Sequence, residues 1–235
     1  TDNGRIGLGG TWYLPQSVAM VIHEVFAPQL IDLDPMNKDD IWTKVFNLMG
    51  VFSYSGAELR ALSAIDIALW DIVGQELEQP IYNLLGGKVR DKARVYYHVI
   101  GDTREKLVKG VREARSAGFT AVGHLTPFLD EERDVTYFKT HAEKMKDAIE
   151  AVQQYREAAG PEVDLCIEIH RRLTPAEAIT LARGIEKFHP LFYEDPILPD
   201  NFVAMPLVAQ NVSIHMATGD RLHNIHKFTF LLKSG

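Results

Sequence analysis

The sequence predicts an α/β fold for its C-terminal part, either a parallel barrel or a doubly wound parallel sheet. From about Ala93, short apolar runs typical of strands alternate with amphipathic segments typical of helices. This alternation favours parallel strands joined by helical crossovers. The segment "VIGDTREK" after the first predicted strand contains no glycine-rich phosphate loop, which disfavours a nucleotide-binding sheet.

The residues before Ala93 are predicted to be mainly helical. Apolar residues recur at spacings of three and four in 17–30 and 38–49. After a turn-rich aromatic loop, a third helix is expected over 57–74, with one apolar stripe and with Gly74 as its end. A short helix opened by Pro80 follows.

The second part of the chain is predicted to contain alternating strands and helices. The expected strands cover 93–101, 119–127, 163–170, 190–196 and 212–220. The expected helices cover 103–117, 130–159, 174–188, 201–210 and 223–233.

The composition is that of an ordinary globular protein, with 46% hydrophobic and 24% charged residues. A formal charge of −7 argues against a nucleic-acid partner and against an anionic membrane surface. No apolar stretch reaches the roughly 20 residues that cross a bilayer. The single cysteine, Cys166, lies in an apolar run and suits a reducing compartment, so we expect a cytoplasmic protein.

Three acidic residues each end a predicted strand. They are Glu168, Glu194 and Asp220, and successive members are 26 residues apart, about one strand–helix unit. In a closed parallel sheet, equivalent positions on neighbouring strands meet at the carboxyl end. Side-chain alternation would direct Glu168 and His170 inward, away from the helices. The sequence therefore predicts three carboxylates on one rim.

Such a group needs a cation. Two anions about 4 Å apart repel by roughly 4 kcal/mol at an effective dielectric constant of 20. Three such pairs cost on the order of 10 kcal/mol, which is comparable to the stability of a domain. An all-oxygen ligand set favours Mg²⁺, with Mn²⁺ as the alternative. The alternative for each acid is an ordinary salt bridge at a strand end.

Three stretches make the chain resemble a known family. They are "SAIDIALWDIVGQELEQPIYNLLGG" (63–87), "IEIHRRLTPAEA" (167–178), and the pair "FYEDPILPDN" (192–201) and "ATGDRL" (217–222). Together they resemble the mandelate racemase/muconate lactonizing enzyme branch of the enolase superfamily, and most closely its acid-sugar dehydratases of the galactonate, gluconate and mannonate type.

The resemblance implies an architecture and a chemistry. It implies an incomplete α+β capping domain with linker helices in residues 1–90, and in 91–235 a modified (β/α) barrel truncated after about five strands. One Mg²⁺ would be held by Glu168, Glu194 and Asp220. His170 would act as general acid or base while the proton α to a sugar acid's carboxylate is removed and water is eliminated through an enediolate.

The chain departs from the family pattern at several points. The usual first ligand is Asp and the usual third is Glu, whereas this chain has Glu168 and Asp220. The second strand lacks the paired lysines of racemases and cycloisomerases. His124 stands near that position, as either a substrate contact or a packed core histidine.

The sequence allows two roles for Arg172 and two for Tyr54, both near the predicted rim. Arg171 and Arg172 follow the histidine, and Arg172 either binds a substrate carboxylate or lies on the surface. Tyr54 belongs either to a capping loop that shapes specificity or to a packing loop. Asp195 is expected to point away from the rim and cap a turn.

A five-stranded open sheet would expose an edge. We therefore expect a longer native protein whose second acid/base group lies beyond Gly235. The expected substrate is a small-molecule sugar acid, and the expected assembly is a homo-oligomer. A racemase or epimerase of the same superfamily, a catalytically inactive homologue and, more distantly, a metal-dependent aldolase are the alternatives.

Overall fold

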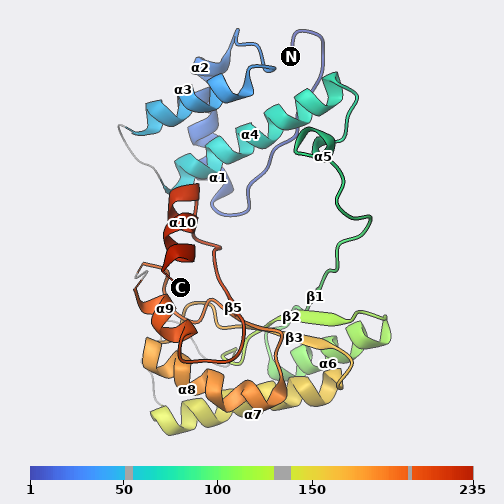
Figure 1. The fold of residues 1–235 in the computed structure, drawn as a ribbon, viewed down its shortest axis with the longest axis vertical. Helices are drawn as coiled ribbons and strands as arrows, with labels where there is room; N and C mark the ends of the chain where they lie inside the picture. The colour runs from blue at the N-terminus through green and yellow to red at the C-terminus, as the bar shows by residue number, and fades with distance from the viewer. Residues whose placement is uncertain (51–54, 130–138, 201–202, 235) are drawn as a thin grey trace. The chain divides into compact units, whose positions relative to one another are not determined.

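The computed structural model describes residues 1–50, 55–129, 139–200 and 203–234 (Figure 1). The chain divides into two compact units, Thr1–Ala93 and Arg94–Gly235. None of the helices in these described ranges is long and apolar enough to cross a membrane.

The first unit is helical, as the periodicity predicts. Its elements are α1 (Pro15–Met20), the π-helical η1 (Val21–Phe26), α2 (Ala27–Leu30), α3 (Lys38–Gly50), α4 (Gly56–Glu76) and α5 (Ile81–Leu84). A buried apolar cluster that includes Phe26, Val45 and Leu62 holds α1, η1, α3 and α4 together.

The prediction that Gly74 ends the third helix is wrong, because α4 continues to Glu76. A Cβ atom at Gly74 would lie 2.6 Å from Ile81 Cδ1. The glycine therefore allows α5 to approach α4 closely rather than stopping the helix.

The second unit contains a five-stranded parallel sheet. Its strands are β1 (Tyr97–His98), β2 (Ala121–Leu125), β3 (Asp164–Glu168), β4 (Phe192–Glu194) and β5 (Met216–Ala217). They lie in the order β1-β2-β3-β4-β5, and every neighbouring pair is parallel. Each crossover therefore moves one strand in the same direction. A doubly wound sheet reverses direction at a switch point, so this order favours the barrel.

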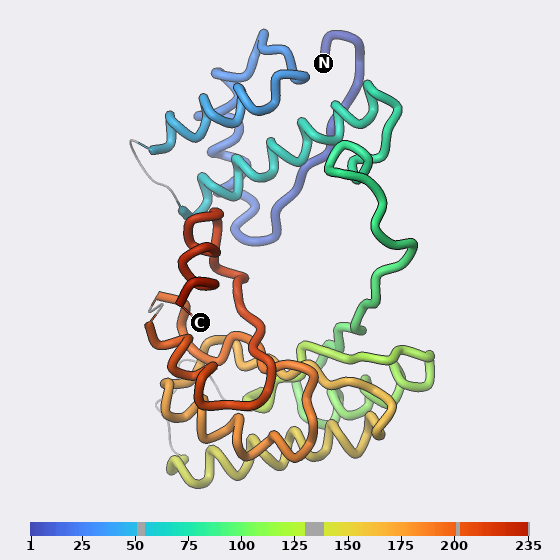
Figure 2. The backbone as a smooth tube through the Cα atoms, in the orientation of Figure 1, coloured from blue at the N-terminus to red at the C-terminus, as the bar shows by residue number. Residues whose placement is uncertain are grey.

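The helices of this unit are α6 (Arg104–Ser116), α7 (His141–Ala159), α8 (Pro175–Ile185) with the 3₁₀ turn η2 (Glu186–Phe188), α9 (Ala204–Ala209) and α10 (Ile225–Lys233). Helices α6, α7 and α8 cover one side of the sheet, and the same path can be followed in the backbone trace (Figure 2). Capping boxes at Thr140 and Thr174 fix the starts of α7 and α8.

The alternation along β3 separates core from rim, as predicted. Leu165, Ile167 and Ile169 are fully buried members of the apolar cluster that the helices share. Cys166 and Glu168 lie between them in sequence and face the other side of the sheet. The polar side chain of Glu168 therefore lies at the carboxyl end of β3, apart from the apolar cluster.

Candidate active site at the carboxyl ends of the strands

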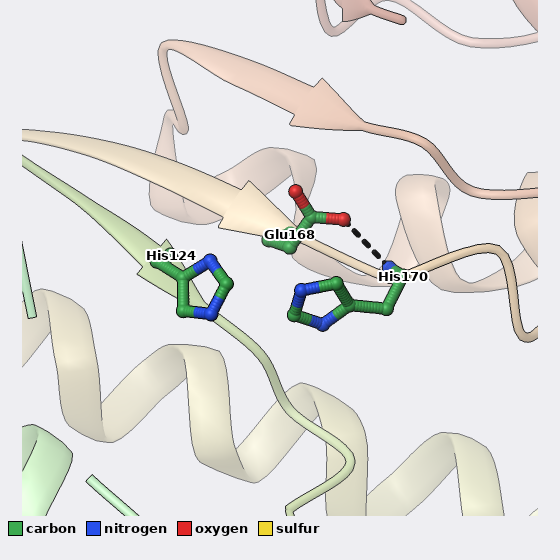
Figure 3. Close-up of side chains that lie close together, drawn as sticks. All are labelled: His124, Glu168 and His170. Carbon is green, nitrogen blue, oxygen red and sulfur yellow. Dashed lines mark hydrogen bonds between the residues drawn. The ribbon is translucent and has the colours of Figure 1, made fainter. Parts of the chain in front are cut away.

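Two of the predicted ligands lie side by side. Glu168 is the last residue of β3 and Glu194 the last of β4, and the two are register partners. Glu168 is only 4% exposed, and its Oε1 accepts a hydrogen bond of 2.7 Å from the backbone N–H of His170 (Figure 3). The parallel register therefore places two carboxyl groups together in a largely dry setting.

Burial and neighbouring charge disfavour ionisation of this pair. Burial raises the pKa of Glu168 to about 8, and the charge of Glu194 adds to the rise. Burial also raises the pKa of Glu194, while a hydrogen bond from the Glu168 carboxyl opposes that rise. Burial and the proximity of the second carboxylate therefore both favour the protonated form of Glu168.

Asp220 lies at the same edge but is not gathered with the pair. It follows β5 by three residues, and Ala217 of β5 is the register partner of Glu194. Its side chain is about half exposed, and its Oδ2 lies 3.8 Å from Arg171 Nη1. Its charge raises the pKa of Glu194, so it lies within electrostatic reach.

The Asp220 carboxylate, which follows β5, thus points toward Arg171. Among the described residues, the potential metal ligands whose ligand atoms all lie within 4.8 Å of one another are those of His124, Glu168 and His170. The structure therefore brings Glu168 and Glu194 together, and leaves Asp220 beside them.

His170 follows β3 in a left-handed turn. Its φ angle is 57° and that of Arg171 is 64°, a conformation that is uncommon for residues other than glycine. The turn directs the imidazole toward His124, whose ring centroid lies 4.6 Å away in an edge-to-face arrangement (Figure 3). A ring nitrogen of His170 thus lies within 4.8 Å of a Glu168 carboxylate oxygen, although the strand ends before this histidine.

His124 lies on β2 at a register irregularity between Val122 and Leu125. Its φ angle is 61°, and such irregularities re-aim side chains near functional sites. The ring is partly buried and stacks on His98, with the centroids 4.1 Å apart. Burial first, and then the neighbouring His98, lower the pKa of His124, which favours the neutral imidazole.

The other predicted substrate residues have different placements. Arg172 donates a hydrogen bond from Nη1 to the backbone oxygen of Phe128 at 2.6 Å, so it ties the segment after β3 to the segment after β2. Tyr54 lies outside the described residues.

Sequence reasoning missed a buried network behind the rim. Asp195 was expected to cap a turn, but it is 3% exposed and binds Arg171 through Oδ2. Its Oδ1 accepts a hydrogen bond of 2.7 Å from Thr218, and the Arg171 backbone N–H donates to its carbonyl oxygen at 2.7 Å. The Asp195 side chain therefore joins the ends of β3, β4 and β5. The sequence signal for this network is the arginine directly after His170 in "HRRL" and the second acid in "YEDP".

Comparison with known proteins identifies the family. Residues 1–86 match the mandelate racemase/muconate lactonizing enzyme N-terminal domain, and residues 106–235 match the enolase C-terminal domain-like family. The chain is 32% identical over 241 aligned positions to D-galactonate dehydratase of Verminephrobacter eiseniae and 30% identical to that of Klebsiella pneumoniae. All of this chain is covered in each case, but it spans only 60% of either relative.

Solved structures agree with this assignment. A provisionally named dehydratase from Mesorhizobium loti has a TM-score of 0.88 at 27% identity and covers 100% of this chain and 64% of its own. A provisionally named isomerase from Sinorhizobium meliloti has a TM-score of 0.85 at 27% identity, with 100% and 58% covered. Members of this superfamily generally bind Mg²⁺. With both family matches and a parallel sheet whose acids end neighbouring strands, the chain belongs to the enolase superfamily.

Proposed function

We propose that the chain is the catalytic part of a Mg²⁺-dependent sugar-acid dehydratase. The observation that carries the proposal is the in-register pair Glu168 and Glu194, with a ring nitrogen of His170 within 4.8 Å of a Glu168 carboxylate oxygen. The likeness to two D-galactonate dehydratases supports this reaction class over others in the superfamily.

The residues present fit a magnesium ion. The pair supplies hard oxygen ligands. Burial raises the pKa of both carboxyl groups, and for Glu168 the charge of Glu194 adds to that rise, so a cation would stabilise the ionised pair. Glu168 and Glu194 would hold the ion, and Asp220 would join them by leaving Arg171. When bound, Mg²⁺ stabilises the negative charge that develops on the substrate carboxylate as its α-proton is lost.

The protein's own contribution is proton transfer and orientation. His170 takes the proton from Cα, and the electron pair of the broken Cα–H bond forms a double bond to Cβ as the Cβ–O bond breaks. His170 gives its proton to the departing hydroxyl, which leaves as water. The resulting enol then becomes a 2-keto-3-deoxy acid. The hydrogen bond between the His170 backbone and Glu168 fixes the histidine relative to the ligand pair.

A racemase or epimerase is the second candidate. The likeness to the Sinorhizobium meliloti protein named as an isomerase favours it. Both reactions begin with loss of the α-proton, but an epimerase returns a proton and retains the elements of water. A catalytically inactive homologue would neither bind the metal nor exchange that proton.

The test is a screen of the intact protein against a sugar-acid library, with Mg²⁺, in deuterated water. A 2-keto-3-deoxy product supports dehydration. Deuterium at Cα with no water lost indicates epimerisation, and neither outcome across the library contradicts both enzymatic proposals. His170→Asn should lower the rate by roughly 10²–10⁴-fold. His215→Asn is the matched control, because this histidine is exposed and lies before β5, away from the carboxyl rim.

A further inference from the structure

We propose that His124, Glu168 and His170 form a binding site for a transition-metal ion, with Zn²⁺ as its best occupant. This site is distinct in its ligands from the all-carboxylate magnesium site, although Glu168 is common to both. Binding of zinc does not depend on the reaction that the protein catalyses. Only its consequence, inhibition, rests on the proposed function.

The geometry of the cluster suits three protein ligands. One ligand atom from each side chain lies within 4.8 Å of the other two. The two imidazole rings face each other between the ends of β2 and β3, and the Glu168 carboxylate lies beside them and is directed toward the His170 backbone N–H (Figure 3). Tetrahedral zinc with bonds of about 2.0–2.1 Å places its ligand atoms roughly 3.3 Å apart. The atoms therefore need to approach by about 1.5 Å at most, which side-chain rotation can supply.

The backbone already directs these side chains toward one another. His124 and His170 both have positive φ angles, which are unfavourable for a non-glycine residue and persist where the surrounding fold imposes them. The His170 backbone N–H holds one Glu168 oxygen at 2.7 Å, so the carboxylate is oriented by its neighbour. His98 stacks behind His124 and supports that ring.

The ligand types determine which ion binds. Two imidazole nitrogens and one carboxylate favour zinc, nickel or copper over magnesium, which prefers oxygen ligands. Three protein ligands leave a coordination position open, as in catalytic zinc sites. Because Glu168 belongs to both sets, zinc and magnesium should compete for the protein. Zinc would also occupy His170 and thereby stop the proton transfer assigned to it.

The experiment measures binding in the absence of substrate. The intact protein, stripped of metal with EDTA and dialysed, is titrated with ZnCl₂ by calorimetry and with CoCl₂ by visible absorption. We expect one zinc per chain, and an intense cobalt spectrum typical of low coordination number with nitrogen ligands. His124→Ala should weaken zinc binding at least 100-fold while leaving Mg²⁺ affinity within about threefold, at the order of effect that ligand loss produces.

A second variant makes the test independent of the magnesium site. Glu194→Gln should weaken Mg²⁺ binding but change zinc affinity far less than His124→Ala does, because Glu194 is outside the three-residue group. His215→Ala should change neither, and the circular dichroism and unfolding midpoint of each variant verify its fold. Zinc affinity that survives His124→Ala in a folded protein overturns the proposal. So does zinc affinity that falls with Glu194→Gln as much as with His124→Ala. Either result leaves the dehydratase proposal untouched.

Discussion

Replacing Arg171 by methionine should destabilise the protein strongly, because it leaves a buried aspartate without its cation. Asp195 is 3% exposed, and the side chain of Arg171 is 14% exposed. Without Arg171, the carboxylate keeps the hydrogen bond from Thr218 but loses its neutralising partner. Breaking a buried ion pair from one side costs about 3–5 kcal/mol. We expect a loss near 3 kcal/mol, since the Thr218 hydroxyl still solvates one oxygen.

The double variant Arg171→Met/Asp195→Asn distinguishes a buried pair from simple loss of packing. Asparagine at position 195 has the same shape as aspartate and can still accept the hydrogen bond from Thr218, and Arg171 still has the half-exposed Asp220 nearby. Asp195→Asn alone should therefore lower the free energy of unfolding by only about 1 kcal/mol. Removing both charges together should cost less than the sum of the two single losses, with a coupling energy of roughly 2 kcal/mol.

The assay is urea unfolding of the intact protein in EDTA, followed by circular dichroism and compared at equal m-values. Lys146→Met is the control, because its ion pair with Glu150 is exposed and spans 3.8 Å. The reasoning is refuted if Arg171→Met costs less than about 1 kcal/mol, or if the two single effects simply add.

Three further predictions concern the site and its support. In EDTA, Glu168→Gln should raise stability at pH 7 by about 3 kcal/mol, because the pKa of Glu168 is raised from 4.5 to about 8 and its protonated form favours folding. That gain should fade as pH falls toward 4.5, and a gain equal at pH 4.5 and pH 7 in urea unfolding would contradict it. Arg156→Met should cost about 3 kcal/mol in the same assay, since the guanidinium donates to four backbone carbonyls at 2.7–3.1 Å. In Mg²⁺ calorimetry, Glu194→Gln should abolish measurable binding, whereas Asp220→Asn should weaken it only about tenfold; equal losses would refute this ranking.

The parallel sheet could be predicted because its signals are local. Each strand is a short apolar run, and each crossover helix has its own periodicity or capping signal, as at Thr174. Glu168 and Glu194 could be paired from spacing alone, since parallel register places equivalent strand ends side by side. The choice between a barrel and a doubly wound sheet could not be made this way. It depends on strand order, which no single segment encodes.

The rest of the site depends on backbone conformations that sequence does not mark. His124, His170, Arg171 and Asp195 all have positive φ angles, yet none is a glycine. Tertiary contacts impose these conformations, such as the hydrogen bond between the Arg171 N–H and the Asp195 carbonyl. Strand alternation stops where β3 ends at Glu168, so it could not predict that His170 meets His124.

The position of Asp220 bears on how a metal site could form here. Glu168 and Glu194 are already adjacent, and burial and the charge of Glu194 raise the pKa of Glu168. Asp220 is half exposed, and its contact with Arg171 spans 3.8 Å. Exposed ion pairs are worth only about 0.2–1 kcal/mol, so moving this carboxylate to a divalent ion costs little. Arg171 meanwhile remains bound to Asp195, so release of Asp220 leaves no buried cation unpaired. The two glutamates are therefore already placed to hold a divalent ion. Asp220, the shorter third acid, would complete the site by moving away from Arg171.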